Sequence, residues 1–156
     1  MKKQDYHCDI TVNAGIREAY ESISKGVPKW WSKDFEGSSE HTGDKFTIRF
    51  VETFVEFKIA EAVTDKKIVW EVTDCYLHGF ADKTEWTGTR MIWEFSTEKE
   101  QTRIDMTHAG LDPEVQCYET CVKGWDFFVK QSLYKLLTEK KGMPNQPAAA
   151  RVAVNV

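Results

Sequence analysis

Two cysteines and one histidine are the residues of this sequence whose types and spacing best suit metal binding. Cys117 and Cys121 are four residues apart, which places both on one face of a helix, and His108 lies on a strand predicted just before that helix. Two thiolates and an imidazole could ligate zinc, but structural zinc sites usually add a second ligand pair, which this sequence lacks. Because unpaired cysteines pack well as small hydrophobic residues, we predict that both are buried structural thiols and that the protein holds no metal and no cofactor.

His108 is also the residue best suited to acid–base catalysis. The two-residue period of its strand places it on the same face as Ile104 and Met106, whereas Asp105 points to the opposite face and cannot orient it. The sequence contains no serine-hydrolase, zinc-protease or phosphate-loop motif. A histidine on an apolar strand face is more often a hydrogen-bonded core residue than an acid or base. We therefore predict no catalytic residue and a binding protein rather than an enzyme, with catalysis by His108 as the alternative.

The composition is that of an ordinary globular domain. The chain has 156 residues and a net charge of −4, and its basic residues are scattered rather than clustered, which argues against nucleic-acid binding. No apolar run approaches the roughly 20 residues of a membrane-spanning helix, and the first ten residues lack the apolar segment of a signal peptide. We therefore expect a cytoplasmic protein in which all four cysteines remain thiols.

The N-terminal part of the chain predicts one strand followed by one helix. Residues 6–12, "YHCDITV", alternate apolar and polar side chains as a half-buried strand does. Asn13 is a suitable N-cap for a helix over residues 14–24, which the following Gly and Pro end. The pair Trp30-Trp31 then falls in a turn or a single helical turn, where we expect it to be exposed.

The middle of the chain predicts a long antiparallel meander with one apolar face. Apolar residues recur with a period of two in five segments: 45–50, 54–63, 66–73, 89–97 and 102–108. Residues 64–67 and 97–101 have the composition of hairpin turns. Loop 75–86 is long enough to be functional, as a lid or as a contact in a homodimer. It carries four large side chains that we expect to be exposed: Tyr76, His78, Phe80 and Trp86.

A long helix and a tail complete the chain. Asp112 and Pro113 suit the N-cap and first residue of a helix that runs to about Lys141 and ends before a Gly-x-Pro. We therefore expect a single domain over residues 1–144 and a flexible tail over residues 145–156, which lacks aromatic residues.

The order of these elements predicts an α+β fold. An antiparallel sheet with one apolar face needs a cover, and the last helix, about 40 Å long, can provide it if the sheet curves around it. Gly124 lies in the middle of this helix, where glycine costs about 1 kcal/mol relative to alanine. With Cys117 and Cys121 it forms a flank of small residues. That flank either lets the helix approach the sheet or leaves a void beside Trp125.

Four stretches, by their order and spacing, resemble the helix-grip fold of the START-like, birch-pollen-allergen-like superfamily, also called SRPBCC. They are "VNAGIREAYESIS" (12–24), "WW" (30–31), "THAGL" (107–111) and "KGWDFFVKQSLYKLLTEKKGMP" (123–144). Within the superfamily, the chain resembles the family named for the activator of the heat-shock-protein-ninety ATPase, in its single-domain bacterial form. The resemblance covers roughly residues 6–144 and implies a β-α-α-β meander-α order of elements.

This resemblance implies an internal cavity that binds a small hydrophobic molecule, because superfamily members bind lipids, hormones and polyketides. The expected partner is therefore lipid-like or aromatic. Some members catalyse cyclisation or hydrolysis in the same cavity, which gives one alternative. A second alternative is a co-chaperone-like protein-interaction module, with loop 75–86 and Trp30-Trp31 as its surface, although the chaperone activators typically carry an additional N-terminal domain.

The predicted binding site lies where the inward faces of three strands meet the last helix. Its apolar members could equally be plain core, because pockets and cores share the same residue types. His108 and Ser132 are predicted to face a polar atom of the ligand. The full set is Trp31, Phe57, Trp70, Trp93, Met106, His108, Cys121, Trp125, Phe128 and Ser132.

Overall fold

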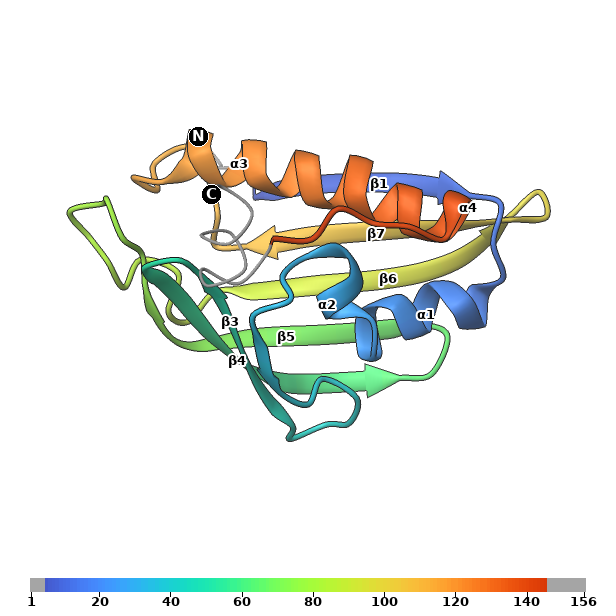
Figure 1. Ribbon diagram of the computed structural model, residues 1–156, viewed down its shortest axis with the longest axis horizontal. Coiled ribbons are helices and arrows are strands. Elements are labelled where there is room, and N and C mark those ends of the chain that lie inside the picture. The colour runs from blue at the N-terminus through green and yellow to red at the C-terminus, as the bar shows by residue number, and fades with distance from the viewer. Residues whose placement is uncertain (1–4, 146–156) are drawn as a thin grey trace, which may run out of the picture.

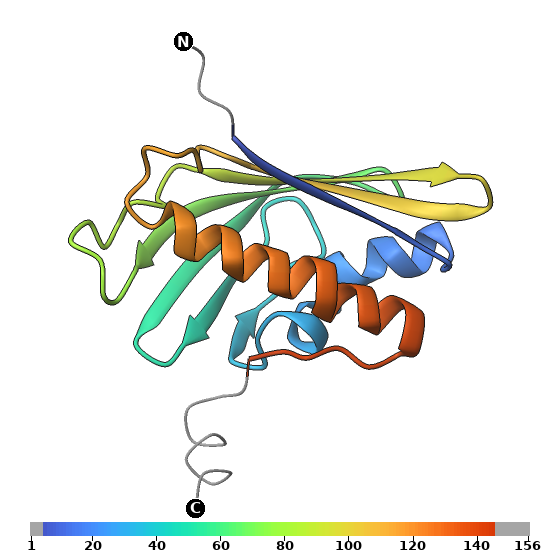
Figure 2. The same ribbon diagram turned by 90° about the horizontal axis from the view of Figure 1, so that it is seen from above.

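Seven strands form an antiparallel sheet that curves around the C-terminal helix (Figures 1 and 2). The structure is a computed structural model that describes residues 5–145. The strands lie in the order β1-β7-β6-β5-β4-β3-β2. Their bounds are β1 (Tyr6–Val12), β2 (Phe35–Gly37), β3 (Lys45–Phe50), β4 (Thr53–Val63), β5 (Lys67–Tyr76), β6 (Arg90–Glu98) and β7 (Gln101–Ala109). The predicted α+β helix-grip architecture is confirmed.

The meander follows the predicted periodicity closely. The turns between β4 and β5 and between β6 and β7 fall within residues 64–67 and 97–101, as predicted. Asp65, Lys99 and Glu100 have positive φ in these turns, a conformation that tight hairpin turns require. Strand β2 was not predicted, because three residues are too few to show an alternation.

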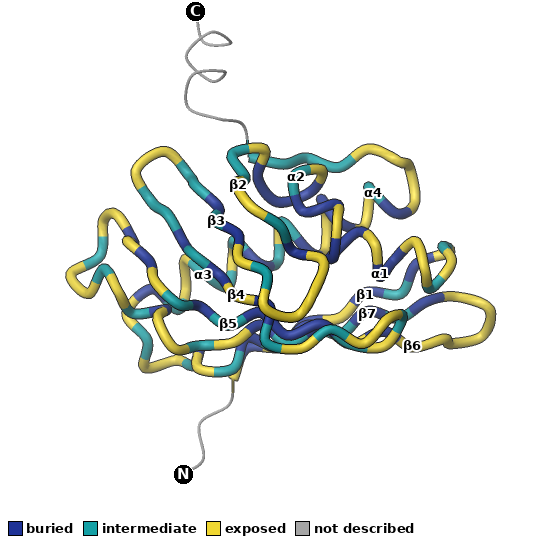
Figure 3. Tube along the Cα trace, turned by 90° about the horizontal axis from the view of Figure 1, so that it is seen from below, coloured by how far each residue is buried: buried dark blue, intermediate teal, exposed yellow. Residues whose placement is uncertain are grey.

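Alternation along each strand turns one face of the sheet toward the helices. On β7, Ile104, Met106 and His108 are buried, whereas Asp105 and Thr107 between them are only partly buried. Figure 3 shows exposed segments gathered in the turns and buried ones where strands pass beside the helices. The period of two therefore places His108 inside the protein, as its sequence position predicts.

The C-terminal helix runs without a break through three parts: α3 (Tyr118–Phe127), the π-helical η1 (Phe128–Leu133) and α4 (Tyr134–Glu139). Its buried stripe has a spacing of four: Trp125, Val129, Leu133 and Leu137. Residues four apart drift about 40° around an α-helix, since 3.6 residues make one turn, and the wider π turn counters that drift. None of the helices within residues 5–145 has the length and apolar character that crossing a bilayer requires.

The predicted start of this helix is wrong, because α3 begins at Tyr118 and not at Pro113. Asp112 closes a separate turn instead. Its carbonyl accepts the backbone N–H of Val115 at 2.9 Å, and its carboxylate accepts that of Glu114 at 2.9 Å. An Asp-Pro pair therefore marks a turn here, five residues before the helix.

Two short helices, α1 (Ile16–Ser24) and α2 (Val27–Trp30), lie against the same face of the sheet as the C-terminal helix (Figure 1). Helix α1 begins after Gly15, and its N-cap has no side-chain hydrogen bond, so the predicted capping by Asn13 is wrong.

The expected exposure of Trp30 and Trp31 is also wrong, because their exposed fractions are 0% and 3%. The indole N–H of Trp30 donates to the carbonyl of Ser22 at 2.9 Å, which gives it a partner inside the core. Trp31 stacks on Trp70 with ring centroids 5.7 Å apart. The turn after α1 thus directs both indoles inward, where they bury a large apolar area.

After α4 the chain returns along the segment that follows α2. Lys140 ends the helix with a left-handed φ of 63°. The backbone N–H of Asn145 donates to the carbonyl of Trp31 at 2.8 Å, and its carbonyl accepts the N–H of Lys33 at 2.9 Å. Asn145, predicted as the first residue of the tail, is therefore bound to the domain, and the rest of the predicted tail, 146–156, lies outside the described residues.

Candidate ligand pocket

A pocket of about 300 Å³ lies between α3 and the loop that joins β5 to β6. This volume falls at the lower end of the range usual for small-molecule pockets, and the walls are mainly apolar and aromatic, as such pockets require. The loop and the start of α3 lie at the same end of the molecule (Figure 1). The lining residues are Trp31, Phe50, Thr53, Val55, Leu77, His78, Phe80, Trp86, Thr120, Cys121, Gly124, Trp125 and Phe128.

Gly124 opens the helix side of this pocket. A Cβ atom built at this position would meet no atom within 4 Å among the described residues, apart from its chain neighbours and its own helix backbone. Of the two explanations predicted for the small flank, the void beside Trp125 is therefore the one that the structure shows. Cys121 and Phe128 lie one turn away on either side and also line the pocket, whereas Cys117, the third member of the small flank, does not.

Three indole rings form the inner wall. Trp86 and Trp125 are stacked with centroids 6.0 Å apart and an interplanar angle of 8°. Trp31 also packs against Trp125, with ring centroids 5.0 Å apart and the planes tilted by 34°. The exposed fractions of all three are below a tenth, so the rings are held by packing on most of their surface. They present an apolar aromatic wall that packing holds in place.

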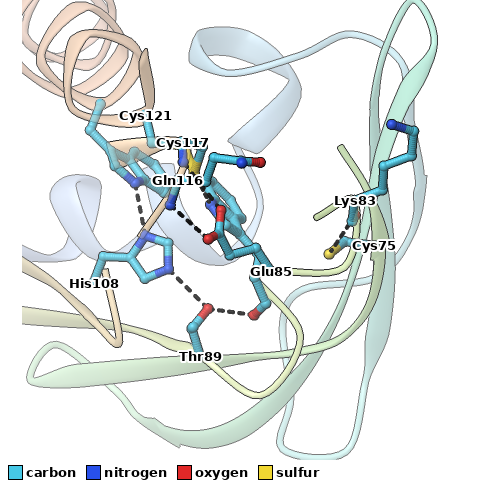
Figure 4. The surroundings of a disulfide bond; sticks show 10 residues. Cys75, Lys83, Glu85, Thr89, His108, Gln116, Cys117 and Cys121 are labelled. Atoms are coloured by element: carbon cyan, nitrogen blue, oxygen red, sulfur yellow. Dashed lines mark hydrogen bonds between the residues drawn. A yellow bond between two sulfur atoms is a disulfide. The ribbon is translucent and has the colours of Figure 1, made fainter. Parts of the chain in front are cut away.

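His108 lies behind this wall and belongs to a chain of hydrogen bonds in which both of its ring nitrogens take part (Figure 4). The Trp125 indole N–H donates to Nδ1 of His108 at 3.1 Å, so Nε2 carries the proton and donates to Oγ1 of Thr89 at 2.9 Å. Thr89 in turn donates to the carbonyl of Trp86 at 2.6 Å. Burial lowers the pKa of His108 to about 3, which keeps the imidazole neutral. With both nitrogens occupied, His108 positions Trp125 and has no free site for a ligand.

A packed aromatic core fills the rest of the space beneath the sheet. Trp70 and Trp93 are fully buried, with centroids 5.1 Å apart, and Trp93 packs edge-to-face on Trp30 at 5.6 Å. The indole N–H groups of Trp70 and Trp93 have no hydrogen-bond partner among the described residues. Such orphaned donors are rare in protein interiors and oppose folding, so the packing around these rings has to offset their cost.

The structure divides the predicted site residues into two groups. Four line the pocket: Trp31, Cys121, Trp125 and Phe128. Six lie in the fully buried interior and do not line it: Phe57, Trp70, Trp93, Met106, His108 and Ser132. Ser132, predicted to face a ligand, donates to the carbonyl of Trp30 at 2.7 Å and accepts the N–H of Met143 at 2.7 Å.

The predicted state of two cysteines is wrong. Cys117 and Cys121 form a disulfide at the start of α3, with their Cα atoms 5.8 Å apart, whereas Cys8 and Cys75 are free thiols (Figure 4). The i, i+4 spacing that brings two side chains to one helix face also brings two sulfur atoms within bonding reach. The expectation of thiols relied on an assumed reducing compartment, which the spacing does not test.

Glu85 joins the two walls of the pocket. Its carboxylate accepts the backbone N–H of Gln116 at 2.6 Å and that of Cys117 at 3.1 Å, just where α3 begins. The Gln116 side chain accepts the backbone N–H of Asp82 at 3.1 Å. The free N–H groups before a helix and its dipole favour a carboxylate at this place, so the loop is fixed to the helix by charge as well as by packing.

Polar groups gather at the pocket mouth. Nε2 of His78 lies 2.8 Å from a carboxylate oxygen of Glu52 in an exposed contact, and the hydroxyl of Thr53 accepts the backbone N–H of His78 at 3.0 Å. Thr120 faces them from α3. The side chains that sequence reasoning missed are mostly those of the loop and its neighbours, although His78, Phe80 and Trp86 had been noted there as exposed. Trp86 is in fact buried, with an exposed fraction of 8%.

The outer face of the sheet holds another group of side chains with metal-ligating atoms. Atoms of His7, Asp9 and Asp105 lie within 4.8 Å of one another. Arg103 binds both carboxylates, at 3.4 Å from Asp9 and 3.1 Å from Asp105. Since the guanidinium supplies the positive charge that a metal would bring, this group is explained as an exposed ion-pair cluster.

The sequence matches no protein-family model and no curated protein. Solved structures do match. The Aha1 dimer from Colwellia psychrerythraea gives a TM-score of 0.75 at 23% identity, over 89% of this chain and 99% of that one. This chain has the helix-grip fold of that structure.

Two further solved structures share this fold. DynU16, from the dynemicin biosynthetic locus, gives a TM-score of 0.64 at 15% identity, over 90% of this chain and 50% of that one. CalU16 from Micromonospora echinospora gives a TM-score of 0.61 at 12% identity, over 82% of this chain and 73% of that one. At identities this low, the TM-scores establish a shared fold and nothing more. They confirm the fold resemblance predicted from the sequence.

Proposed function

We propose that this protein binds a small hydrophobic molecule, lipid-like or aromatic, in the pocket beside Gly124. One observation carries the proposal: an apolar pocket of about 300 Å³ opens where a glycine stands in mid-helix and three indoles form the wall. A void costs packing energy, and glycine within a helix costs about 1 kcal/mol relative to alanine. A ligand that fills the space would offset both costs.

The ligand's orientation would be set at the mouth of the pocket. His108 and Ser132 are engaged inside the protein, so they do not serve as the polar anchor first predicted. Thr53, His78 and Thr120 stand at the open side instead. We therefore expect a flat or greasy body against Trp86 and Trp125, with a polar end near these three residues.

A binding role suits the pocket better than catalysis. An acid or base must reach the reacting atom, and the neutral His108 has both nitrogens bonded behind the indole wall. The fold similarity to DynU16, from a biosynthetic locus, suggests a cyclase or hydrolase reaction by analogy only. Such a reaction would need other groups, such as His78 at the mouth.

The second candidate function is a protein-interaction module, supported by the fold similarity to the Aha1 dimer. Trp30 and Trp31 are buried, so of the two predicted parts of the interaction surface only loop 75–86 is left. Loop 75–86 retains one exposed aromatic side chain, Tyr76, with an exposed fraction of 39%. A homodimer contact through this loop stays part of this second proposal.

Titration with N-phenyl-1-naphthylamine, an uncharged fluorescent dye, tests the binding proposal. Wild-type protein should bind the dye, and Gly124→Leu should bind it at least about tenfold more weakly, because the new side chain fills the space that the glycine leaves open. The matched control is Lys123→Leu, which adds the same side chain at an exposed neighbouring position. Equal binding by wild-type protein and Gly124→Leu would contradict the proposal.

A further inference from the structure

The two sulfur atoms of the Cys117–Cys121 disulfide occupy different surroundings. Cys121 belongs to the pocket wall and is partly exposed. Cys117 has an exposed fraction of 1% and does not line the pocket. A molecule inside the pocket can therefore contact Cys121 and not Cys117. Thiol–disulfide exchange depends on which sulfur is attacked and on how well the other sulfur leaves.

The environment of Cys117 suits a leaving thiolate. The indole N–H of Trp86 donates to its sulfur at 3.3 Å, in a buried place where a hydrogen bond to a negative charge is strong. The start of α3 adds a favourable dipole. The carboxylate of Glu85 opposes this effect, but it is already bonded to two backbone N–H groups, those of Gln116 and Cys117.

We propose that this disulfide is an exchange site for an apolar thiol that enters the pocket, an inference that rests on the proposed binding function. The thiolate of the entering molecule forms a bond to Sγ of Cys121 as the Cys117–Cys121 bond breaks. The electron pair of that bond leaves on Cys117, which takes up the proton released by the entering thiol. The disulfide itself supplies the oxidation, so no other oxidant is needed.

The products define a reversible covalent capture. The molecule is held as a mixed disulfide on Cys121, with its apolar body against Trp86 and Trp125. Cys117 stays close by, and its return attack on Cys121 releases the molecule and restores the original disulfide. Cys8 and Cys75 are buried and do not line the pocket, and burial raises the pKa of Cys8 to about 11, which disfavours its thiolate.

The test compares two thiols of similar acidity, benzyl mercaptan and 2-mercaptoethanol, at equal concentration with the full chain. After a short reaction, the protein is transferred into denaturant with excess iodoacetamide, and tandem mass spectrometry locates each modification. We expect the thiol on Cys121 and the carbamidomethyl group on Cys117, with about tenfold more adduct from benzyl mercaptan because the pocket concentrates an apolar body. Gly124→Leu should lose this preference, and Lys123→Leu should keep it.

Three results would overturn the inference: no disulfide in the purified protein, an adduct on Cys117 as often as on Cys121, or equal yields from the two thiols. Failure of the binding proposal is recognised separately, because the uncharged dye needs no sulfur chemistry. A protein that binds the dye but gives equal thiol yields has a ligand pocket without a selective exchange site.

Discussion

The space beneath the sheet is filled solidly toward α2 and left open toward the start of α3. Toward α2, Trp93 packs against both Trp30 and Trp70, and all three are fully buried. Toward the start of α3, Trp125 faces a pocket across the flank of Gly124. The same residue type therefore serves as core at one end and as wall at the other, and the difference lies in the size of its neighbours on the helix.

The difference also extends to hydrogen bonding. In the packed region the indole N–H groups of Trp70 and Trp93 have no partner among residues 5–145. At the pocket, those of Trp86 and Trp125 donate to Cys117 and His108. Packing alone holds the first pair, whereas polar partners fix the orientation of the second pair. A wall that must keep its shape with an empty space beside it gains from such fixed orientation.

Replacing Trp93 by alanine should produce the largest loss of stability. The side chain is fully buried among other rings, so its removal leaves a large cavity and should lower the free energy of unfolding by about 3–5 kcal/mol. Phe128→Ala, on the partly exposed pocket wall, should cost markedly less, because solvent and neighbouring side chains can enter the space it leaves. Urea denaturation measures both, and equal losses would erase the distinction between the two regions.

Sequence periodicity predicted the sheet well and the helix boundary poorly. The period of two is set by the pleat of each strand, so it found β3 to β7 and the inward position of His108. The start of α3 depends on Glu85, which lies about thirty residues earlier and caps the helix through space. No local pattern around Asp112 and Pro113 contains that contact.

The candidate site was predicted on its helix side and missed on its loop side. Cys121, Trp125 and Phe128 follow from helical spacing, and Gly124 signalled the space that they border. The loop residues fold back on the helix through contacts that have no periodicity. A sequence also does not tell Trp70 from Trp125, since only the packing of neighbours decides which of them faces a void.

The pH dependence of stability tests whether water reaches His108, which lies between the packed region and the pocket. Burial lowers its pKa from 6.5 to about 3, so below pH 6.5 the unfolded chain binds a proton that the folded protein does not. The free energy of unfolding should therefore fall as pH decreases from about 6.5 toward 3, by up to about 1.4 kcal/mol per pH unit from this residue. Above pH 6.5 its contribution is constant.

Denaturation of wild-type protein and His108→Gln at pH 7, 6 and 5 isolates this contribution, because other titrating groups affect both proteins alike. As the pH is lowered, the free energy of unfolding of wild-type protein should fall more than that of His108→Gln. An NMR titration of His108 with a midpoint near 6.5 would mean that water reaches the imidazole, and the pocket would then extend past the wall formed by Trp86 and Trp125.

The smallest expected effect is that of Gly124→Ala, and it has the opposite sign. A Cβ at this position meets open space, so the methyl group should fit without displacing a neighbour. The unfolded chain has less backbone conformational entropy with alanine than with glycine, so less entropy is lost when the helix forms. The free energy of unfolding should therefore rise by up to about 1 kcal/mol. Gly26→Ala is the control, because its Cβ would lie 3.1 Å from backbone atoms of Ser22 and should bring no such gain. Urea denaturation of both variants decides the matter: a loss of stability on Gly124→Ala would mean that the helix already touches its surroundings there, and that the open region is closed in solution.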